Sequence, residues 1–177
     1  MKIIDHTKEY TGQDYIKFIN ALISYVPESD LTNIGTINIY DKCPKHYPVI
    51  AQGAYWPPDN KGKGAVDIYL DQCFGHMLTF NNKSNINSKI ADSLFVFLFG
   101  KKHLAHTLFH EIGHLVYEQT GQKVKKEESE KFAEEYAQNL YYKAYPSQRN
   151  WYSLTNTIYK KIYSSRIQHD ENNRKKL

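Results

Sequence analysis

Apolar residues near the start of the chain recur at steps of three and four, which is the spacing of one face of an α-helix. The recurring residues are Tyr15, Ile16, Ile19, Leu22, Ile23 and Val26. Thr11 offers a hydroxyl that can cap the first turn, and Pro27 ends the pattern. The sequence therefore predicts an amphipathic helix from Thr11 to Val26.

Three short runs with the composition of strands follow this helix. They extend from Ile34 to Tyr40, from Tyr47 to Trp56 and from Ala65 to Leu70. Segments dense in turn-forming residues separate them, at residues 41–44 and 57–64. The pattern predicts a small, mostly antiparallel sheet.

Helical patterns dominate the second half of the chain. Residues 86–98 are compatible with a buried helix, although their Phe-rich run could also form a strand. A further helix is predicted from Leu104 to Gln119, and Gly121 closes it because glycine tolerates the positive φ that often follows a helix end. Two more helices are predicted, from Glu127 to Tyr142 and from Trp151 to Ile167.

Length and composition favour a single domain over residues 1–177, since 41% of the residues are hydrophobic and can form a core. Cys43 and Cys73 show neither zinc-finger spacing nor a disulfide framework. The first ten residues are charged where a signal peptide is apolar, and no apolar run is long enough to span a bilayer. We therefore expect a cytoplasmic protein that does not enter a membrane.

Basic charge gathers toward the C-terminus. The first 100 residues carry 9 lysines and 10 acidic residues, whereas residues 101–177 carry 14 basic and 9 acidic residues. Residues 168–177 are expected to form a flexible basic tail. Such a tail can contact nucleic acid, but a short terminal run of charge is typically solvated, so nucleic-acid binding is not expected.

The segment His110-Glu-Ile-Gly-His114 carries the main candidate chemistry, because it lies inside a predicted helix. Residues four apart on an α-helix differ by about 40° in azimuth and about 6 Å in height, so both imidazoles can reach one ion. Glu111 lies about 100° round from His110 and can meet water at the metal instead of binding the metal itself. Zinc suits this arrangement, because neutral imidazole is a good ligand and an open position leaves room for water.

A second group of candidate residues shares one stripe of the next predicted helix. The group consists of Glu130, Ala133, Glu134 and Ala137. The two alanines permit close approach to another helix. Glu130 could then bind the metal, and Glu134 could hydrogen-bond the far nitrogen of a ligand histidine. An ordinary solvated acidic face is the alternative.

Residues 107–137 resemble the gluzincins, zinc metallopeptidases with HExxH on one helix and a ligand glutamate on the next. The compact chain is similar to the minigluzincins and to the peptidase-like domain of the ImmA/IrrE type. Glu134 departs from the family pattern, which usually has Asp or Asn at that position. The resemblance implies a cleft bordered by the edge strand of the sheet, and we expect Gly64 to Asp71 to be that strand.

These observations lead us to expect an α+β, zincin-like fold with an N-terminal helix, a small sheet, an active-site helix, a glutamate helix and a C-terminal helix. The expected function is hydrolysis of peptide bonds in a peptide or protein substrate. In this interpretation His110, His114 and Glu130 hold Zn²⁺, Glu111 is the catalytic base and Glu134 supports a ligand imidazole.

Two other functions stay open. A zincin-like chain can serve as a metal-dependent regulator or interaction module with little turnover. A deformylase-type amidohydrolase would pair Cys73 with the two histidines as a third ligand, although the residues around Cys73 do not match the deformylase motif. His106, one turn before His110, is expected either to support the site or to be partly exposed, and not to bind the metal.

Overall fold

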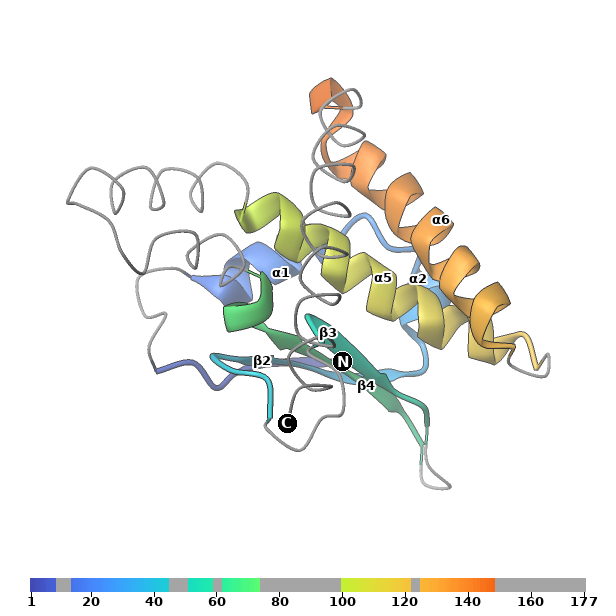
Figure 1. Ribbon diagram of the computed structural model, residues 1–177, viewed down its shortest axis with the longest axis horizontal. Coiled ribbons are helices and arrows are strands. Elements are labelled where there is room, and N and C mark those ends of the chain that lie inside the picture. Colours follow the sequence, from blue (N-terminus) through green and yellow to red (C-terminus); the bar gives the residue numbers. More distant parts are fainter. Residues whose placement is uncertain (9–13, 45–50, 59–61, 74–99, 122–124, 149–177) are drawn as a thin grey trace, which may run out of the picture. The chain divides into compact units, whose positions relative to one another are not determined.

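The computed structural model describes residues 1–8, 14–44, 51–58, 62–73, 100–121 and 125–148 (Figure 1). The chain divides into two compact units, Met1–Ala144 and Tyr145–Leu177. The second unit includes a short 3₁₀ helix, η3 (Pro146–Gln148). The helices predicted at residues 86–98 and 151–167, and the basic tail at 168–177, lie outside the described residues.

Four strands among the described residues form one mixed sheet in the order β1-β2-β4-β3. They are β1 (Lys2–Asp5), β2 (Ile34–Tyr40), β3 (Gly53–Trp56) and β4 (Gly64–Tyr69). β2 has the predicted bounds, and β4 begins and ends one residue before the predicted run. β3 occupies the last part of the predicted second run, of which residues 47–50 lie outside the described residues. The α+β class is therefore confirmed.

The prediction of a mostly antiparallel sheet is wrong. β1 and β4 both run parallel to β2, whereas β3 and β4 are antiparallel. β1 gives no sequence signal, because it has four residues and only Ile3 is partly buried. It is joined to β2 through helices, and such a crossover permits parallel pairing where a tight turn does not. β4 then enters between β2 and β3, so these two strands, which are consecutive in the sequence, are not neighbours in the sheet.

The prediction that Gly64 to Asp71 forms the edge strand is also wrong. β4 pairs with β2 on one side and with β3 on the other. Its residues from Val66 to Tyr69 are buried, which is typical of an interior strand. Among the described strands, the edge next to β4 is β3, where the Trp56 side chain is 47% exposed.

The N-terminal helix, α1 (Tyr15–Ile23), forms where the amphipathic pattern predicts it but begins later. Asp14 is its N-cap, and the Asp14 Oδ1 atom accepts a hydrogen bond from the Lys17 backbone N–H at 2.8 Å. Thr11 is therefore not the cap, because an aspartate nearer the apolar residues satisfies the free N–H groups of the first turn. A short helix, α2 (Glu28–Leu31), follows Pro27.

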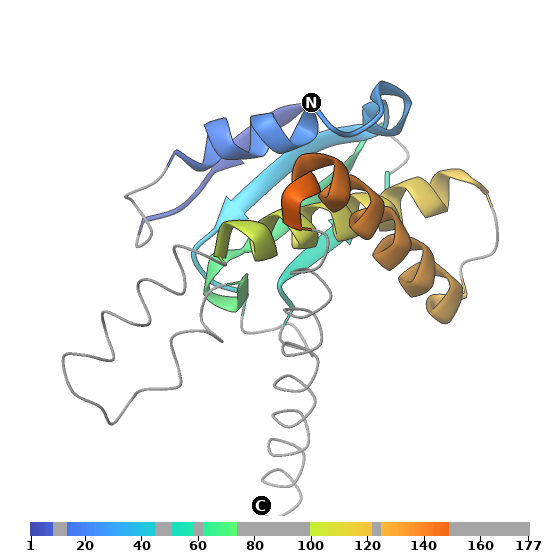
Figure 2. The same cartoon turned by 90° about the horizontal axis from the view of Figure 1, so that it is seen from above.

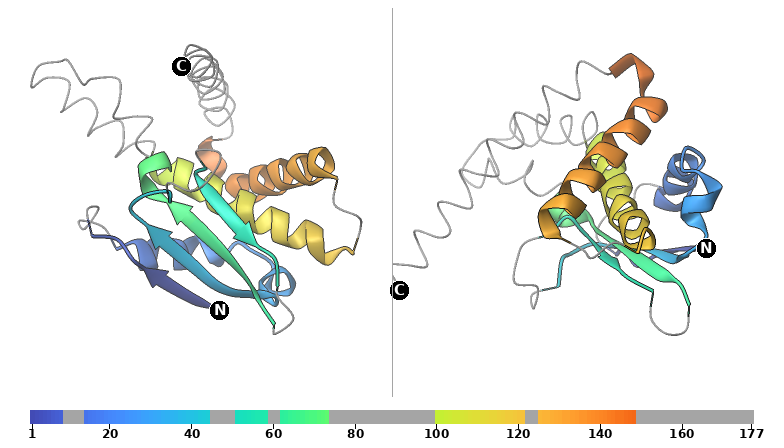
Figure 3. Two further views of the ribbon diagram at one scale, coloured as in Figure 1. Left: turned by 60° about the horizontal axis from the view of Figure 1, so that its bottom comes forward. Right: turned by 90° about the vertical axis from the view of Figure 1, so that its right-hand side faces the viewer.

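The long helix α5 (Lys101–Gln119) lies against β3 and β4, and α1 lies on the same face of the sheet (Figures 2 and 3). Gly121 follows α5 with a φ of 68°, as predicted from its position. Apolar side chains on this face of the sheet and on α5 are fully buried. They include Ile37, Ile39, Val66, Ile68, Leu104, Leu108 and Ile112.

The second long helix, α6 (Lys126–Ala144), packs mainly along α5 (Figure 3). Ala133 and Ala137 are fully buried, which confirms that the small residues of the predicted stripe face a neighbouring helix. Tyr136 donates a hydrogen bond to Asp30 at 2.7 Å and so ties α6 to α2. None of the described helices combines the length and apolar character that a bilayer-spanning segment needs.

Candidate metal centre

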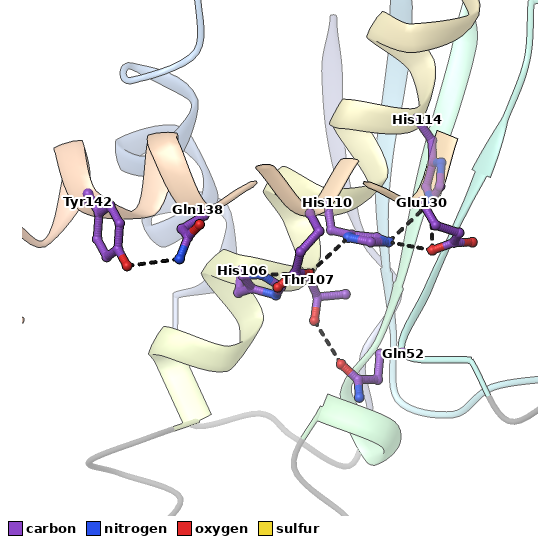
Figure 4. Close-up of polar contacts among 9 residues, drawn as sticks. Gln52, His106, Thr107, His110, His114, Glu130, Gln138 and Tyr142 are labelled. Atoms are coloured by element: carbon purple, nitrogen blue, oxygen red, sulfur yellow. Dashed lines mark hydrogen bonds and ion pairs between the residues drawn. The ribbon is translucent and has the colours of Figure 1, made fainter. Parts of the chain in front are cut away.

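Three of the predicted site residues meet between α5 and α6. His110 and His114 come from α5 and Glu130 from α6, and Figure 4 shows their polar ends pointing toward one another. The Nε2 atoms of the two histidines are 3.1 Å apart. Glu130 Oε2 lies 3.4 Å from Nε2 of His110 and 3.7 Å from Nε2 of His114.

These three distances suit a tetrahedral metal site. Bonds of about 2.0–2.2 Å to nitrogen and oxygen give a tetrahedron whose edges are roughly 3.3–3.6 Å. The separations of 3.1, 3.4 and 3.7 Å lie close to that range. The set also combines two imidazoles with one carboxylate, a donor set typical of catalytic zinc that leaves a fourth position for water. The residues present therefore fit a zinc ion.

The packing of α5 against α6 depends on two small residues beside the ligands. A Cβ atom added to Gly113 would lie 2.8 Å from the Cα atom of Ala133, closer than real Cβ contacts. Gly113 is adjacent to His114, and Ala133 is one turn after Glu130. The close approach at this point therefore lets a glutamate side chain from α6 reach both histidines of α5.

Glu111 is 9% exposed and faces β3, not the ligand set. A Cβ atom added to Gly53 would lie 2.7 Å from Glu111 Cγ and 3.0 Å from its Oε1 atom, so the edge strand passes directly against this carboxyl group. Burial raises the pKa of Glu111 to about 7; the charge of Glu130 adds to the rise, and that of His110 opposes it. A carboxyl group with this pKa can both accept and return a proton near neutral pH.

The two histidines differ in protonation when no metal is bound. Burial lowers the pKa of His110, but the nearby carboxylates of Glu130 and Glu134 outweigh this effect and raise it to about 9. Burial, together with the positive charge of His110, lowers the pKa of His114 to about 4. The hydrogen bond with His110 lowers the pKa of Glu130. A cationic His110 thus lies between carboxylates, beside a neutral His114.

The tautomer of His114 decides the direction of its two polar contacts. Two imidazole nitrogens 3.1 Å apart can hydrogen-bond only if one of them carries a proton. When the single proton of a neutral His114 lies on Nδ1, it points toward the Ser129 hydroxyl oxygen, 2.8 Å away. The same tautomer leaves the Nε2 lone pair available for a metal.

Ser129 and Tyr55 contact His114, although no sequence pattern singles them out. Ser129, 3% exposed, lies immediately before Glu130 on α6. Tyr55 of β3 stacks on the His114 ring with centroids 4.8 Å apart and planes 19° apart. Burial, followed by a hydrogen bond with Glu118, raises the pKa of Tyr55 to about 12, so its hydroxyl stays protonated. The position of Ser129 next to the candidate ligand Glu130 does not by itself distinguish it from other polar residues of the helix.

His106 lies on the side of His110 that is away from Glu130 (Figure 4). Glu134 Oε2 is 3.7 Å from Nδ1 of His110 and 3.4 Å from Nε2 of His106. Glu134 is thus beside the far nitrogen of a candidate ligand histidine, although 3.7 Å is longer than the predicted hydrogen bond. His106 contacts Glu134 and does not belong to the group of His110, His114 and Glu130.

Cys73 lies apart from the three candidate ligands. Its thiol is buried, 3.6 Å from the Gln52 carbonyl oxygen and 3.9 Å from the Thr107 hydroxyl. Burial raises the pKa of Cys73 to about 12, which disfavours the thiolate that binds metals. Thr107 donates a hydrogen bond to the Gln52 side-chain oxygen at 3.1 Å (Figure 4). These contacts give no support to a deformylase-type site with a cysteine ligand.

The geometry of α5, α6 and β3 carries the functional argument by itself. A search of protein-family models, of curated proteins and of solved structures finds no match to this chain. The resemblance to the gluzincins therefore stays a prediction from residues 107–137.

Proposed function

We propose that this chain is a zinc-dependent peptidase. The observation that carries the proposal is the convergence of His110 Nε2, His114 Nε2 and Glu130 Oε2 at 3.1–3.7 Å, with a buried carboxyl group on the residue after His110. His110, His114 and Glu130 would hold the ion. When bound there, zinc would polarise a scissile carbonyl group and make a water molecule more acidic.

Glu111 is the proposed proton carrier of the reaction. It lies on the same helix as both histidines but points toward β3, so it does not compete for the ion. Its carboxylate would take a proton from the attacking water and later give it to the leaving amine. Gly53 permits this position, because any larger residue would occupy the space of the Glu111 side chain.

The edge strand β3 supports a peptide as the substrate. Among the described strands, β3 pairs with β4 on one side only, and Gly53 and Tyr55 place it beside Glu111 and His114. An extended chain can add to such an edge by main-chain hydrogen bonds, which do not depend on its sequence. We therefore propose that β3, and not β4, aligns the scissile bond.

The test compares zinc content with cleavage of an unstructured protein. The protein should purify with about one zinc per chain, and His110→Ala or His114→Ala should lose it. Glu130→Ala should weaken zinc binding far more than Glu127→Ala, which removes an exposed carboxylate of the same helix. Unchanged zinc affinity in Glu130→Ala, together with a loss in Glu127→Ala, would move the ligand to the other glutamate.

Turnover separates the proposed peptidase from a regulator with little activity. Glu111→Gln should retain zinc and abolish cleavage, because an amide is nearly isosteric with a carboxyl group but cannot accept the proton. A library of unstructured peptides provides the broad substrate set. A wild-type protein that binds zinc through His110 and His114 but cleaves no member of the library would contradict the peptidase and favour the regulator.

A further inference from the structure

The imidazole of His114 is enclosed on the sides that face away from the proposed metal position. Ser129 contacts its Nδ1 atom at 2.8 Å, and Tyr55 covers one face of its ring. The residues His114 and Ser129 are 5% and 3% exposed, so water competes little for their hydrogen bond. The orientation of this ring is therefore set by protein groups before any ion binds.

The two ligand histidines have partners of different chemistry on the same helix. Glu134, a carboxylate, lies beside Nδ1 of His110 at 3.7 Å. Ser129, a neutral hydroxyl, lies beside Nδ1 of His114. Ser129 and Glu134 flank the ligand Glu130 in the sequence, so α6 supplies one ligand and a partner for each histidine.

We infer that Ser129 is a positioning residue of the proposed zinc site, which holds His114 in the tautomer that presents Nε2 to the metal. The inference rests on the proposed function, because it concerns the same ligand. The Ser129 hydroxyl accepts the Nδ1 proton, and its own proton is free to turn toward a carbonyl group of the preceding helical turn. Without that acceptor, the buried ring can place its proton on either nitrogen, and only one choice leaves the ligand atom free.

The expected effect of Ser129→Ala is a loss of zinc affinity of about 10 to 100-fold, the usual result of removing a partner of a metal-bound histidine. Affinity can be measured by competition with a chromophoric chelator. Thr107→Val is the matched control, because Thr107 is a buried hydroxyl residue one turn before the ligands that contacts Gln52 and no ligand imidazole. It should bind zinc as the wild type does.

A second pair of variants separates the hydroxyl from the space that Ser129 fills. Thr and Val have nearly the same shape, so Ser129→Thr should retain most of the affinity while Ser129→Val loses it. If neither of these two variants folds, the zinc affinities of Ser129→Ala and Thr107→Val decide whether the hydroxyl is needed. Equal zinc affinity in Ser129→Ala, Thr107→Val and the wild type would overturn the inference.

Nitrogen NMR of the imidazoles in the metal-free protein gives a readout independent of zinc. The His114 ring should show its proton on Nδ1 in the wild type and a mixture of tautomers in Ser129→Ala. A pure Nδ1–H tautomer in both proteins would overturn the inference. His114→Ala distinguishes the two proposals: if it binds zinc as tightly as wild type, the metal site itself is wrong, and the role of Ser129 fails with it.

Discussion

Replacing Glu111 by glutamine should stabilise the metal-free protein, and increasingly so as the pH rises. Burial raises the pKa of Glu111 from an ordinary value of 4.5 to about 7. Between these two values the folded protein holds a proton that the unfolded chain has released. The free energy of unfolding therefore falls as the pH rises from 4.5 to 7, and stays lowered at higher pH.

The size of the effect follows from the two pKa values of Glu111. One pH unit corresponds to about 1.4 kcal/mol, so the difference between 4.5 and about 7 amounts to about 3 kcal/mol. Glutamine carries no charge at any pH, so the Glu111→Gln variant does not lose this stability as the pH rises. The difference in unfolding free energy between Glu111→Gln and wild type should grow by about 3 kcal/mol from pH 4 to pH 8.

Urea unfolding, followed by circular dichroism on protein stripped of metal, can measure this difference at each pH. Glu127→Gln is the control, because Glu127 lies exposed on α6, and its difference from wild type should not change in this way. A difference for Glu111→Gln that is constant with pH, or that favours wild type at pH 8, would refute the burial of a proton-holding carboxyl group at this position.

Three further predictions concern the surroundings of the ligands. Gly113→Ala should lower zinc affinity and cost about 1–3 kcal/mol of stability, because its Cβ would lie 2.8 Å from Ala133 Cα and force α6 away; unchanged titration and melting curves would contradict the close contact. Gly53→Ala should reduce cleavage while leaving zinc affinity unchanged, since its Cβ would lie 2.7 Å from Glu111 Cγ; a parallel loss of zinc would show that β3 supports the ligands instead. Zinc binding at pH 7.5 should release about one proton, because the pKa of His110 is about 9 without metal and a ligand imidazole must lose its proton. Calorimetry detects the release, because the heat of zinc binding then depends on the ionisation enthalpy of the buffer. Equal binding heats in buffers of different ionisation enthalpy would contradict the prediction.

The parts of the site that the sequence predicts are those that one helix determines. His110, Glu111 and His114 have fixed relative positions once α5 forms, and the buried Ala133 shows which face of α6 meets it. Tyr55 could not be predicted in the same way, because it reaches His114 from a strand some sixty residues earlier. Such contacts depend on the three-dimensional arrangement of separate elements.

The direction of the strands could not be predicted from the sequence for a similar reason. Turn-forming residues between short strands indicate where the chain bends, but they do not indicate which strand it will pair with next. The antiparallel pair of β3 and β4 follows a short connection and was expected. One parallel pair involves β1, which has almost no buried side chain to reveal it. The other pairs β2 with β4, because β4 enters between β2 and β3.

The proposed ligands all belong to one helical hairpin, with His110 and Glu130 only twenty positions apart. Closing a loop of this length costs little chain entropy, so α5 and α6 can meet early in folding, before the distant strands pair. An ion bound at that stage would hold α5 and α6 together and speed the formation of the hairpin. Metal supply during synthesis would then influence how much of the protein reaches the folded state, apart from any effect on catalysis.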